Sequence, residues 1–423
     1  MVTDKPTPKL AIVIPGFQAD ERDWCIPAFT NLAAQLAQTA QVHVFALRYP
    51  HARRRYSVGK VHVHATGGGA LAGRRVWALS LLGLWRQALA DIWHEHLRSP
   101  FSIVMGIWAT ESGWLATRAA RRLGVPSLVH IAGGELVWLP QIRYGNMRRS
   151  LAGLLVRSTL KQADCLTVPS RFIKHALLHG PAAHSLRASV EEWAPGVDTA
   201  LFTPADGPHG GADSHQTFTF VTAGSLIPVK QHSWLLEAMA VIKQAAPECP
   251  VRLQIAGAGP LMSVLLSQVV ALQLQRHVDF LGEVPHHALP DLYRQAHCFV
   301  LGSLHEAQCM AVLEAMACGL PWVGPAVGAL ADIAATGPSS APTGIAVQER
   351  TPEALARAML EMMHLPDATR RQWGMQARRR IVANYQLGTQ TSRLLSIMLR
   401  LSRGGLIGES APPDPGVKTA PLL

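Results

Sequence analysis

Two glutamates eight residues apart, Glu306 and Glu314, have a spacing that could place two carboxylates along one side of one element. The pattern predicts that a strand ends shortly before Glu306 and that a helix over 310–317 carries Glu314. The free backbone N–H groups near Met310 and Ala311, in the first turn of this helix, could then bind an anion. One carboxylate could bind sugar hydroxyls and the other the two hydroxyls of a ribose, with a diphosphate at the helix end. Glutamate pairs at this spacing are also common by chance.

Two further positions have residue types that suit phosphate. Gly16 follows a strand predicted over 10–14, and a missing side chain there lets an anion approach the backbone. Lys230 lies in a loop after a strand predicted over 218–223, where its ammonium could neutralise a phosphate. A solvated lysine and a plain turn explain these two positions equally well when each is taken alone.

The elements that must position these residues alternate between strands and helices. Strands are predicted over 10–14, 42–47, 101–105, 127–131, 165–168, 218–223, 251–255 and 298–301, with a further strand beginning at 321. Such alternation predicts parallel, doubly wound α/β sheets. A stretch rich in proline and glycine over 203–215 predicts a linker between two similar halves. The expected fold is therefore two facing Rossmann-like domains with a cleft between them.

Length and composition agree with a folded enzyme of two domains. The chain has 423 residues, 48% of them hydrophobic and 16% charged, which excludes a disordered chain, a collagen and a coiled coil. Six cysteines without close pairs exclude a disulfide scaffold. Cys298, Cys309 and Cys318 are too widely spaced for a zinc knuckle, so we expect reduced thiols in a core.

The positive charge lies in the first half of the chain. Residues 1–200 hold 23 Lys and Arg against 12 Asp and Glu, whereas residues 201–423 hold 16 of each. Eight of the eleven tryptophans are also in the first half. Such a half attracts nucleic acid, an anionic lipid surface or a phosphorylated substrate. No nucleic-acid motif accompanies the charge, so nucleic acid is not an expected partner. The segment 74–98 fits either a buried amphipathic helix or one that seeks a membrane surface.

The sequence shows no secretory signal or membrane span. The first apolar run reaches Pro15 after five residues, and the longest apolar tract, 76–93, is broken by Arg86 and Asp91. We therefore expect a cytoplasmic protein, with peripheral contact to the cytoplasmic membrane face left open.

The surroundings of the glutamate pair closely resemble a known signature. The runs Ser-Leu-His-Glu at 303–306 and Leu-Glu-Ala-Met-Ala-Cys-Gly-Leu-Pro at 313–321 resemble that of family-4 glycosyltransferases with the GT-B fold. The resemblance extends to about residue 400. Further segments similar to that family's are 130–135, 163–170, 194–204, 224–230 and 280–284.

The resemblance implies roles for the charged candidates. Glu306 would contact the transferred sugar, and Glu314 would contact the ribose. Lys230 would neutralise the diphosphate, helped by Gly16. Such enzymes use a nucleotide-diphosphate sugar, retain its anomeric configuration and need no metal or other cofactor, and the chain contains no Asp-x-Asp metal motif.

Other candidates take their roles from the same resemblance. The backbone at Val284 would hold the base of the donor, and the amides near Met310 and Ala311 would face its diphosphate. His130 stands where the family has a histidine facing the donor sugar, and it could donate a hydrogen bond to a donor hydroxyl or phosphate. A histidine at a strand end is often only structural.

Three positions depart from the family pattern. Ser225 stands where the family usually has an arginine on the diphosphate. The region after Gly16 lacks a second glycine, and Gly328-Ala329 replaces a glycine pair. With the arginine missing, either Lys230 suffices together with backbone amides, or another basic residue substitutes, or activity is weak.

The predicted function is that of a hexosyltransferase-type enzyme. It would move a sugar from a UDP- or GDP-sugar to a hydroxyl acceptor that is lipid-linked or anionic, in polysaccharide or glycolipid biosynthesis. The alternatives are a catalytically weak nucleotide-sugar-binding protein, or a sugar-nucleotide epimerase or a phosphorylase on the same fold. We expect an acceptor-side domain over 1–205, a donor domain over 206–385, a helix over 386–403 that returns to the first domain, and a disordered tail over 404–423.

Overall fold

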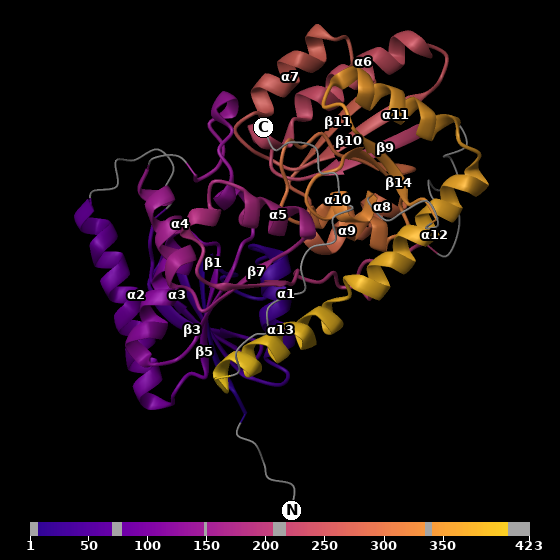
Figure 1. The fold of residues 1–423 in the computed structure, drawn as a ribbon. Coiled ribbons are helices and arrows are strands. Elements are labelled where there is room, and N and C mark those ends of the chain that lie inside the picture. The colour runs from indigo at the N-terminus through magenta and orange to yellow at the C-terminus, as the bar shows by residue number, and fades with distance from the viewer. Residues whose placement is uncertain (1–6, 70–77, 148–149, 206–216, 335–340, 405–423) are drawn as a thin grey trace, which may run out of the picture. The chain divides into compact units, whose positions relative to one another are not determined.

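A computed structural model describes residues 7–69, 78–147, 150–205, 217–334 and 341–404 (Figure 1). The chain divides into unit 1, Met1–Gly196 with Leu387–Leu423, and unit 2, Val197–Gln386. The boundary after Gly196 falls nine residues before the expected limit at 205. The boundary after Gln386 falls one residue after the expected limit at 385. Most of the predicted linker and nearly all of the predicted tail lie outside the described residues, as do Arg74, Arg75 and Trp77.

Unit 1 is built on an eight-stranded sheet with the order β3-β4-β2-β1-β5-β6-β7-β8. All neighbouring strands are parallel except β3 and β4, which form an antiparallel hairpin at one edge. The strands are β1 (Lys9–Gly16), β2 (Gln41–Tyr49), β3 (Arg54–Val58), β4 (Val61–Ala65), β5 (Ile103–Ile107), β6 (Ser127–His130), β7 (Cys165–Val168) and β8 (Ser189–Glu192). The strand order reverses at β1, between β2 and β5, as in a doubly wound sheet.

Helices cover both faces of this sheet. They are α1 (Pro27–Leu36), α2 (Ala78–Arg98), α3 (Glu111–Leu123), α4 (Leu151–Gln162), α5 (Arg171–His179) and α13 (Leu387–Ser402). Because side chains alternate along β1, Leu10 and Ile12 pack in the core that includes α1 and α13, whereas Ala11 and Val13 pack in the core that includes α2 and α3. The helix α13 belongs to unit 1, although it is the last in the chain.

Unit 2 has a six-stranded parallel sheet with the order β11-β10-β9-β12-β13-β14. The strands are β9 (Phe218–Ala223), β10 (Val251–Ala256), β11 (Val278–Gly282), β12 (Cys298–Val300), β13 (Trp322–Pro325) and β14 (Gly344–Val347). In order along the chain this is 3-2-1-4-5-6, the Rossmann arrangement. The predicted pair of Rossmann-like domains is therefore confirmed.

The helices of unit 2 pack on both faces of its sheet. They are α6 (His232–Ala245), α7 (Met262–Ala271), α8 (Leu289–Arg294), α9 (Met310–Ala317), α10 (Ala329–Ala334), α11 (Pro352–His364) and α12 (Asp367–Asn384). One core includes α6, α7 and α11, and the other includes α9, α10 and α12. Cys298, Cys309 and Cys318 are buried free thiols, as predicted.

Residues 78–98 of the segment predicted as an amphipathic helix form α2, and residues 74–77 lie outside the described part of the chain. Ala88 and Ile92 are buried against the sheet, whereas Leu82 and Leu97 are 50% and 64% exposed. Part of the apolar surface of α2 is thus buried in the core, and part is exposed to solvent. None of the helices in the described part of the chain is long and apolar enough to span a bilayer.

Candidate functional site

The loops at the carboxyl ends of β9 and β12 form the centre of the candidate site in unit 2. Strand β9 has β10 on one side and β12 on the other, so the strand order reverses between β9 and β12. Ligands of open parallel sheets bind at such a reversal, outside the carboxyl ends of the strands. The loop 224–231 follows β9, and the loop 301–309 follows β12.

Lys230 and Glu306 meet between these two loops. Lys230 Nζ lies 2.6 Å from Glu306 Oε1, and the Ser303 hydroxyl donates to the same oxygen over 2.7 Å. The Leu304 N–H donates to the Val229 carbonyl over 2.9 Å, which holds the two loops together beside the pair. The two side chains are 27% and 11% exposed, so the pair is partly shielded from water yet open to a ligand.

The environment keeps the Lys230 ammonium charged. Burial works against the charge, but the attraction of Glu306 and its hydrogen bond outweigh burial and raise the pKa of Lys230. Gly224 lies beside this ammonium, since a Cβ built there would be 3.7 Å from Lys230 Cε. The ammonium thus has a carboxylate on one side and a position without a side chain on another.

Gly257 lets two loops touch. Its φ is +144°, and a Cβ at this position would lie 2.0 Å from the Gly224 carbonyl oxygen. The Gly257 N–H donates to the Gly282 carbonyl over 2.7 Å, which ties it to the end of β11 as well. Any larger residue would push the loop after β10 away from the loop that carries Lys230.

Helix α9 begins four residues after Glu306. Met310 and Ala311 are its first two residues, and Cys309 before them has φ +65° and gives no side-chain cap. The backbone amides of this first turn carry the positive end of the helix dipole. The backbone of Gly328 packs closely against this segment, because a Cβ there would be 2.8 Å from the Glu306 carbonyl oxygen. This close approach requires a glycine at the first position of the Gly328-Ala329 pair.

Glu314 has a different partner from Glu306. Its Oε1 lies 2.8 Å from His286 Nε2, and its side chain is 8% exposed. The His286 ring packs edge to face on Phe202, with 5.1 Å between the centroids. Because Glu306 precedes α9, the two carboxylates come from a loop and a helix. Val284 is two residues before His286 in the loop after β11, so this loop and Glu314 are brought together.

Ser225 has a neutral hydroxyl and brings no charge to the loop. It is exposed, and its backbone carbonyl accepts from the Ile227 N–H over 2.9 Å. After Lys230, the next basic candidate along the sequence is His232, at the start of α6. Its side chain is buried, and its Nδ1 has no hydrogen-bond partner among the described residues. Burial and then the charge of Lys230 lower the pKa of His232 to about 4. It is neutral at pH 7 and does not replace the missing arginine as a cation.

Gly16 and His130 belong to unit 1. A Cβ on Gly16 would be 3.2 Å from Tyr49 Cβ and 3.3 Å from Cys25 Sγ, so packing alone favours glycine there. His130 ends β6, is 1% exposed, and has its Nδ1 3.0 Å from Thr167 Oγ1. Burial lowers the pKa of His130 to about 3. A neutral imidazole can donate one hydrogen bond to a ligand but no positive charge.

Glu135 is a buried organiser of unit 1 that the sequence pattern did not single out as a site. Its carboxylate accepts from the N–H groups of Ala109, Ala132 and Gly133, over 3.3, 3.0 and 2.6 Å. Burial raises the pKa of Glu135, although these amides act in the opposite direction. The side chain joins the loop after β5 to the loop after β6, where His130 ends the strand. The only sequence signal was its place in the Gly-Gly-Glu run.

Two family models match the chain in succession. The model described as glycosyl transferases group 1 matches residues 212–380, and the model described as glycosyl transferase 4-like domain matches residues 26–184. The first match includes Lys230, Glu306 and Glu314, and the second includes His130.

Curated proteins are similar over larger and smaller parts of the chain. A D-inositol 3-phosphate glycosyltransferase of Salinispora arenicola is 29% identical over 303 residues, which are 67% of this chain and 65% of that protein. The match thus spans slightly less than two thirds of that relative. One subunit of the phosphatidylinositol N-acetylglucosaminyltransferase of Arabidopsis thaliana is 34% identical over 137 residues, which are 32% of this chain and 29% of that protein.

Solved structures share the fold over nearly the whole chain. A sucrose-phosphate synthase from Thermosynechococcus elongatus superposes with a TM-score of 0.71 and 18% identity, over 94% of this chain and 100% of that one. Anabaena HepE, solved in complex with UDP and glucose, superposes with a TM-score of 0.68 and 14% identity, over 93% and 100%.

Proposed function

Because the chain belongs to the glycosyl transferases group 1 family and has the GT-B fold, we propose that it transfers a hexose from a nucleoside-diphosphate sugar to a hydroxyl acceptor. The observation that carries this proposal is the meeting of Lys230, Glu306 and the N-terminus of α9 at the strand reversal of unit 2. A nucleotide-sugar binder without turnover and an epimerase or phosphorylase are not favoured by the family match.

The leaving diphosphate gains negative charge as the sugar departs, and fixed positive groups stabilise that charge. Lys230 supplies one cation, and the first amides of α9 supply oriented dipoles. Glu306 faces the transferred sugar and accepts from its hydroxyls. In the absence of donor it holds Lys230 in place through the 2.6 Å contact. The ammonium then shares its hydrogen bonds between the carboxylate and the diphosphate.

The nucleoside lies on the loop after β11. Glu314 binds the ribose hydroxyls with the oxygen that His286 does not occupy, and the backbone near Val284 holds the base. UDP and UDP-glucose are named in the titles of the Anabaena structures, which supports a UDP-sugar over a GDP-sugar. The reaction retains the anomeric configuration and uses no metal at the diphosphate, because Lys230 and the α9 amides take that part.

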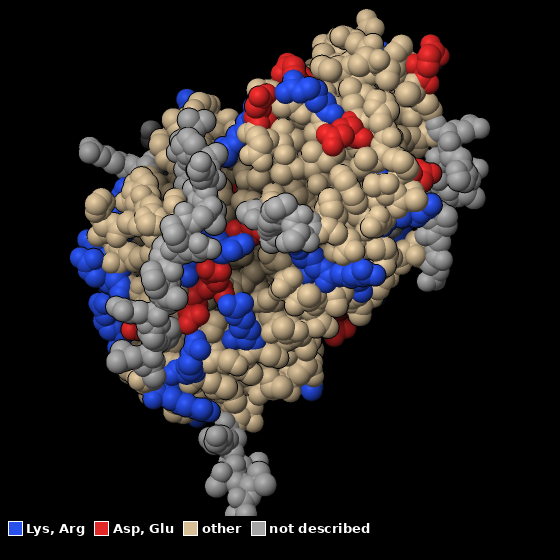
Figure 2. All heavy atoms as spheres, turned by 45° about the vertical axis from the view of Figure 1, so that its right-hand side comes forward, with Lys and Arg blue, Asp and Glu red and all other residues tan. Residues whose placement is uncertain are grey.

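The acceptor is anionic. Unit 1 exposes arginines on α2, on α3, on β3 and directly before β3: Arg53, Arg54, Arg55, Arg86, Arg98, Arg118, Arg121 and Arg122. Arg118 and Arg122 lie over the rings of Trp114 and Trp93. On the face drawn in Figure 2, blue side chains gather at the lower left, over unit 1. The names of the relatives include an inositol phosphate and a phosphatidylinositol, which supports a phosphorylated acceptor, either soluble or at the surface of an anionic membrane.

A product assay tests this function. Purified protein is incubated with UDP-glucose, UDP-N-acetylglucosamine or GDP-mannose and with one of three acceptors, which are inositol, inositol 3-phosphate, or phosphatidylinositol in vesicles. We expect at least tenfold faster transfer to a phosphorylated acceptor than to inositol, and an α-linked product by NMR. A faster reaction in vesicles would identify the lipid, and a faster reaction in solution the free phosphate. A β-linked product, or a preference for inositol itself, would contradict the proposal.

A further inference from the structure

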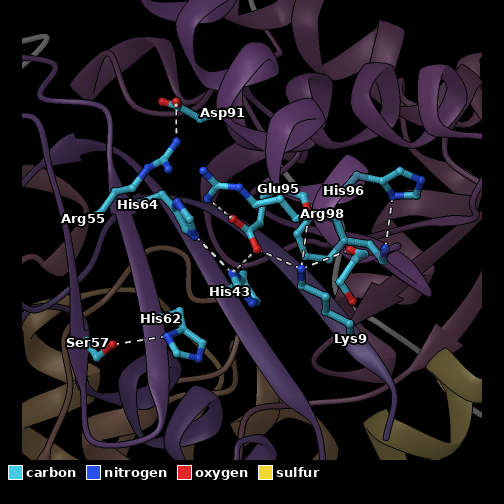
Figure 3. A network of polar contacts seen from close by, with 12 residues as sticks. Lys9, His43, Arg55, Ser57, His62, His64, Asp91, Glu95, His96 and Arg98 are labelled. Carbon is cyan, nitrogen blue, oxygen red and sulfur yellow. Dashed lines mark hydrogen bonds and ion pairs between the residues drawn. The ribbon is translucent and has the colours of Figure 1, made fainter. Parts of the chain in front are cut away.

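A buried cluster of polar side chains lies in unit 1, between the sheet and α2 (Figure 3). His43 comes from β2, His64 from β4 and Glu95 from α2. We propose that these three side chains form a binding site for a divalent transition-metal ion of the Zn²⁺ class. The site is in unit 1, is separate from the residues proposed to bind the donor, and does not depend on the proposed function.

The distances fit a small metal ion. His43 Nδ1 lies 3.0 Å from His64 Nε2 and 3.8 Å from Glu95 Oε1, and the three ligand atoms all lie within 4.8 Å of one another. Ligands of a tetrahedral zinc ion with bonds of about 2.1 Å are about 3.4 Å apart. The observed distances lie on either side of this value, so small side-chain rotations would bring all three atoms onto one ion. The fourth position is left to water.

The chemistry of the donors suits zinc as well. Two imidazole nitrogens and one carboxylate oxygen are a common zinc ligand set. Desolvation by burial lowers the pKa of His43 to about 3 and that of His64 to about 4, so both imidazoles are neutral and able to coordinate at pH 7. His43 and His64 are 8% and 7% exposed, and both strands are fixed in the sheet, so their backbones are preorganised.

Hydrogen bonding alone leaves the histidine pair incomplete. The contact between His43 and His64 uses one nitrogen of each ring. The other ring nitrogen of His64, Nδ1, is buried and has no hydrogen-bond partner among the described residues. A buried polar atom without a partner costs about 1–3 kcal/mol. An ion on Nε2 would leave this Nδ1 without a partner, so the proposal depends on the geometry of the three ligand atoms and not on this nitrogen.

Lys9 is the main competitor for Glu95. Its Nζ donates to Glu95 Oε1 over 2.9 Å, and also to the backbone carbonyls of Glu95 and Ser99 over 3.3 and 3.0 Å. These two carbonyls lie at the carboxyl end of α2, where the helix dipole favours a cation. Lys9 therefore keeps two acceptors when Glu95 turns an oxygen to a metal. Arg98, on the other Glu95 oxygen at 3.3 Å, is 65% exposed and screened by water.

Metal binding would join β2, β4 and the last turns of α2. The hairpin of β3 and β4 is the edge of the sheet, and Arg53 and Arg55 already hold it to Asp91 of α2 at 3.4 and 3.3 Å. An ion on His43, His64 and Glu95 would add a stronger link between the same elements. The expected consequence is a more stable unit 1 rather than a change in the chemistry of the donor site.

The test uses protein without a histidine tag, titrated with Zn²⁺ by calorimetry and with Co²⁺ by visible absorption. We expect one site of micromolar affinity or tighter, the intense absorption of tetrahedral Co²⁺, and a thermal unfolding midpoint that rises by several degrees with Zn²⁺. His43→Ala and His64→Ala should each weaken binding at least 100-fold. The matched control is His94→Ala, an exposed histidine on α2, and it should bind as the unchanged protein does.

Lys9→Met gives a second, independent readout. Removing the competing ammonium should tighten Zn²⁺ binding at least tenfold, whereas a merely structural network would only lose stability. The chain has 19 histidines, and some of them can bind Zn²⁺ weakly. Binding that persists in His43→Ala and His64→Ala is attributed to those other histidines. The proposal is overturned if the unchanged protein shows no saturable binding at millimolar Zn²⁺. It is also overturned if a His64→Gln variant that folds normally binds Zn²⁺ as tightly as the unchanged protein does. Should the histidine variants fail to fold, the absence of tetrahedral Co²⁺ absorption in the unchanged protein would overturn it equally.

Discussion

Lys230→Met is expected to lower kcat for sugar transfer by about 10³-fold. The variant removes the ammonium that lies 2.6 Å from Glu306 and leaves that carboxylate beside the place of the diphosphate. Since Ser225 stands where an arginine is usual and His232 is neutral, no second cation in this loop compensates. Initial rates at saturating donor measure the effect.

The control for this variant is Lys243→Met. Lys243 lies on α6 of the same unit. Its Nζ donates a hydrogen bond to the Gln273 carbonyl over 2.8 Å. We expect its kcat to stay within twofold of the unchanged enzyme. The double variant Lys230→Met/Glu306→Gln separates stability from catalysis. It should recover stability that Lys230→Met loses through an unpaired carboxylate, and it should recover no activity. A kcat for Lys230→Met within fivefold of the unchanged enzyme would refute the assigned role.

Glu306→Gln is expected to lower kcat by about 10²–10³-fold with little change in the KM for the donor. The amide has the size of the carboxylate and can still accept from Ser303, but it lacks the charge that binds the sugar as positive charge develops on it. Lys230 is then released toward the diphosphate, which keeps the donor bound. Steady-state kinetics with varied donor separate the two constants.

An exposed glutamate on α11 of the same unit, Glu361, provides the comparison. Glu361→Gln removes one negative charge away from the loops of the donor site and should change neither constant more than twofold. If Glu306→Gln raised KM and left kcat unchanged, Glu306 would be a ground-state binding residue, and the account of the transfer step would be wrong.

Much of the fold follows from local pattern. The apolar runs at 10–14, 218–223 and 251–255 became the strands β1, β9 and β10, because buried parallel strands need continuous apolar residues. The hairpin of β3 and β4 was missed. Its first strand contains Arg54 and Arg55, which resemble a solvated segment, and charged residues are common at an exposed sheet edge.

The division between the units depends on contacts that no local pattern reveals. The Val197 N–H donates to the Tyr385 carbonyl over 2.7 Å, and Arg378 donates to the carbonyls of Thr199 and Phe202. These bonds assign the residues after Gly196 to unit 2, before the proline- and glycine-rich stretch begins. Composition marked that stretch as the boundary, whereas the contacts place it earlier.

The candidate site shows the same limit. Residue types and family resemblance identified Lys230, Glu306 and Glu314, but not which side chains they contact. Lys230 and Glu306 are 76 residues apart, and Glu314 meets His286 from another loop. Such pairs arise from the order of strands in the sheet, so spacing along the chain could not reveal His286.

The most direct test of the donor site is a calorimetric titration of the protein with UDP- and GDP-sugars, with Glu314→Ala and Glu349→Ala beside it. Glu349 is an exposed glutamate of unit 2 whose side chain pairs with Arg357, which makes it a suitable control. The account predicts micromolar binding of one donor, at least tenfold weaker binding by Glu314→Ala, and no change in Glu349→Ala. Absence of binding by every donor, or a Glu314→Ala variant that binds as tightly as the unchanged protein, would contradict it.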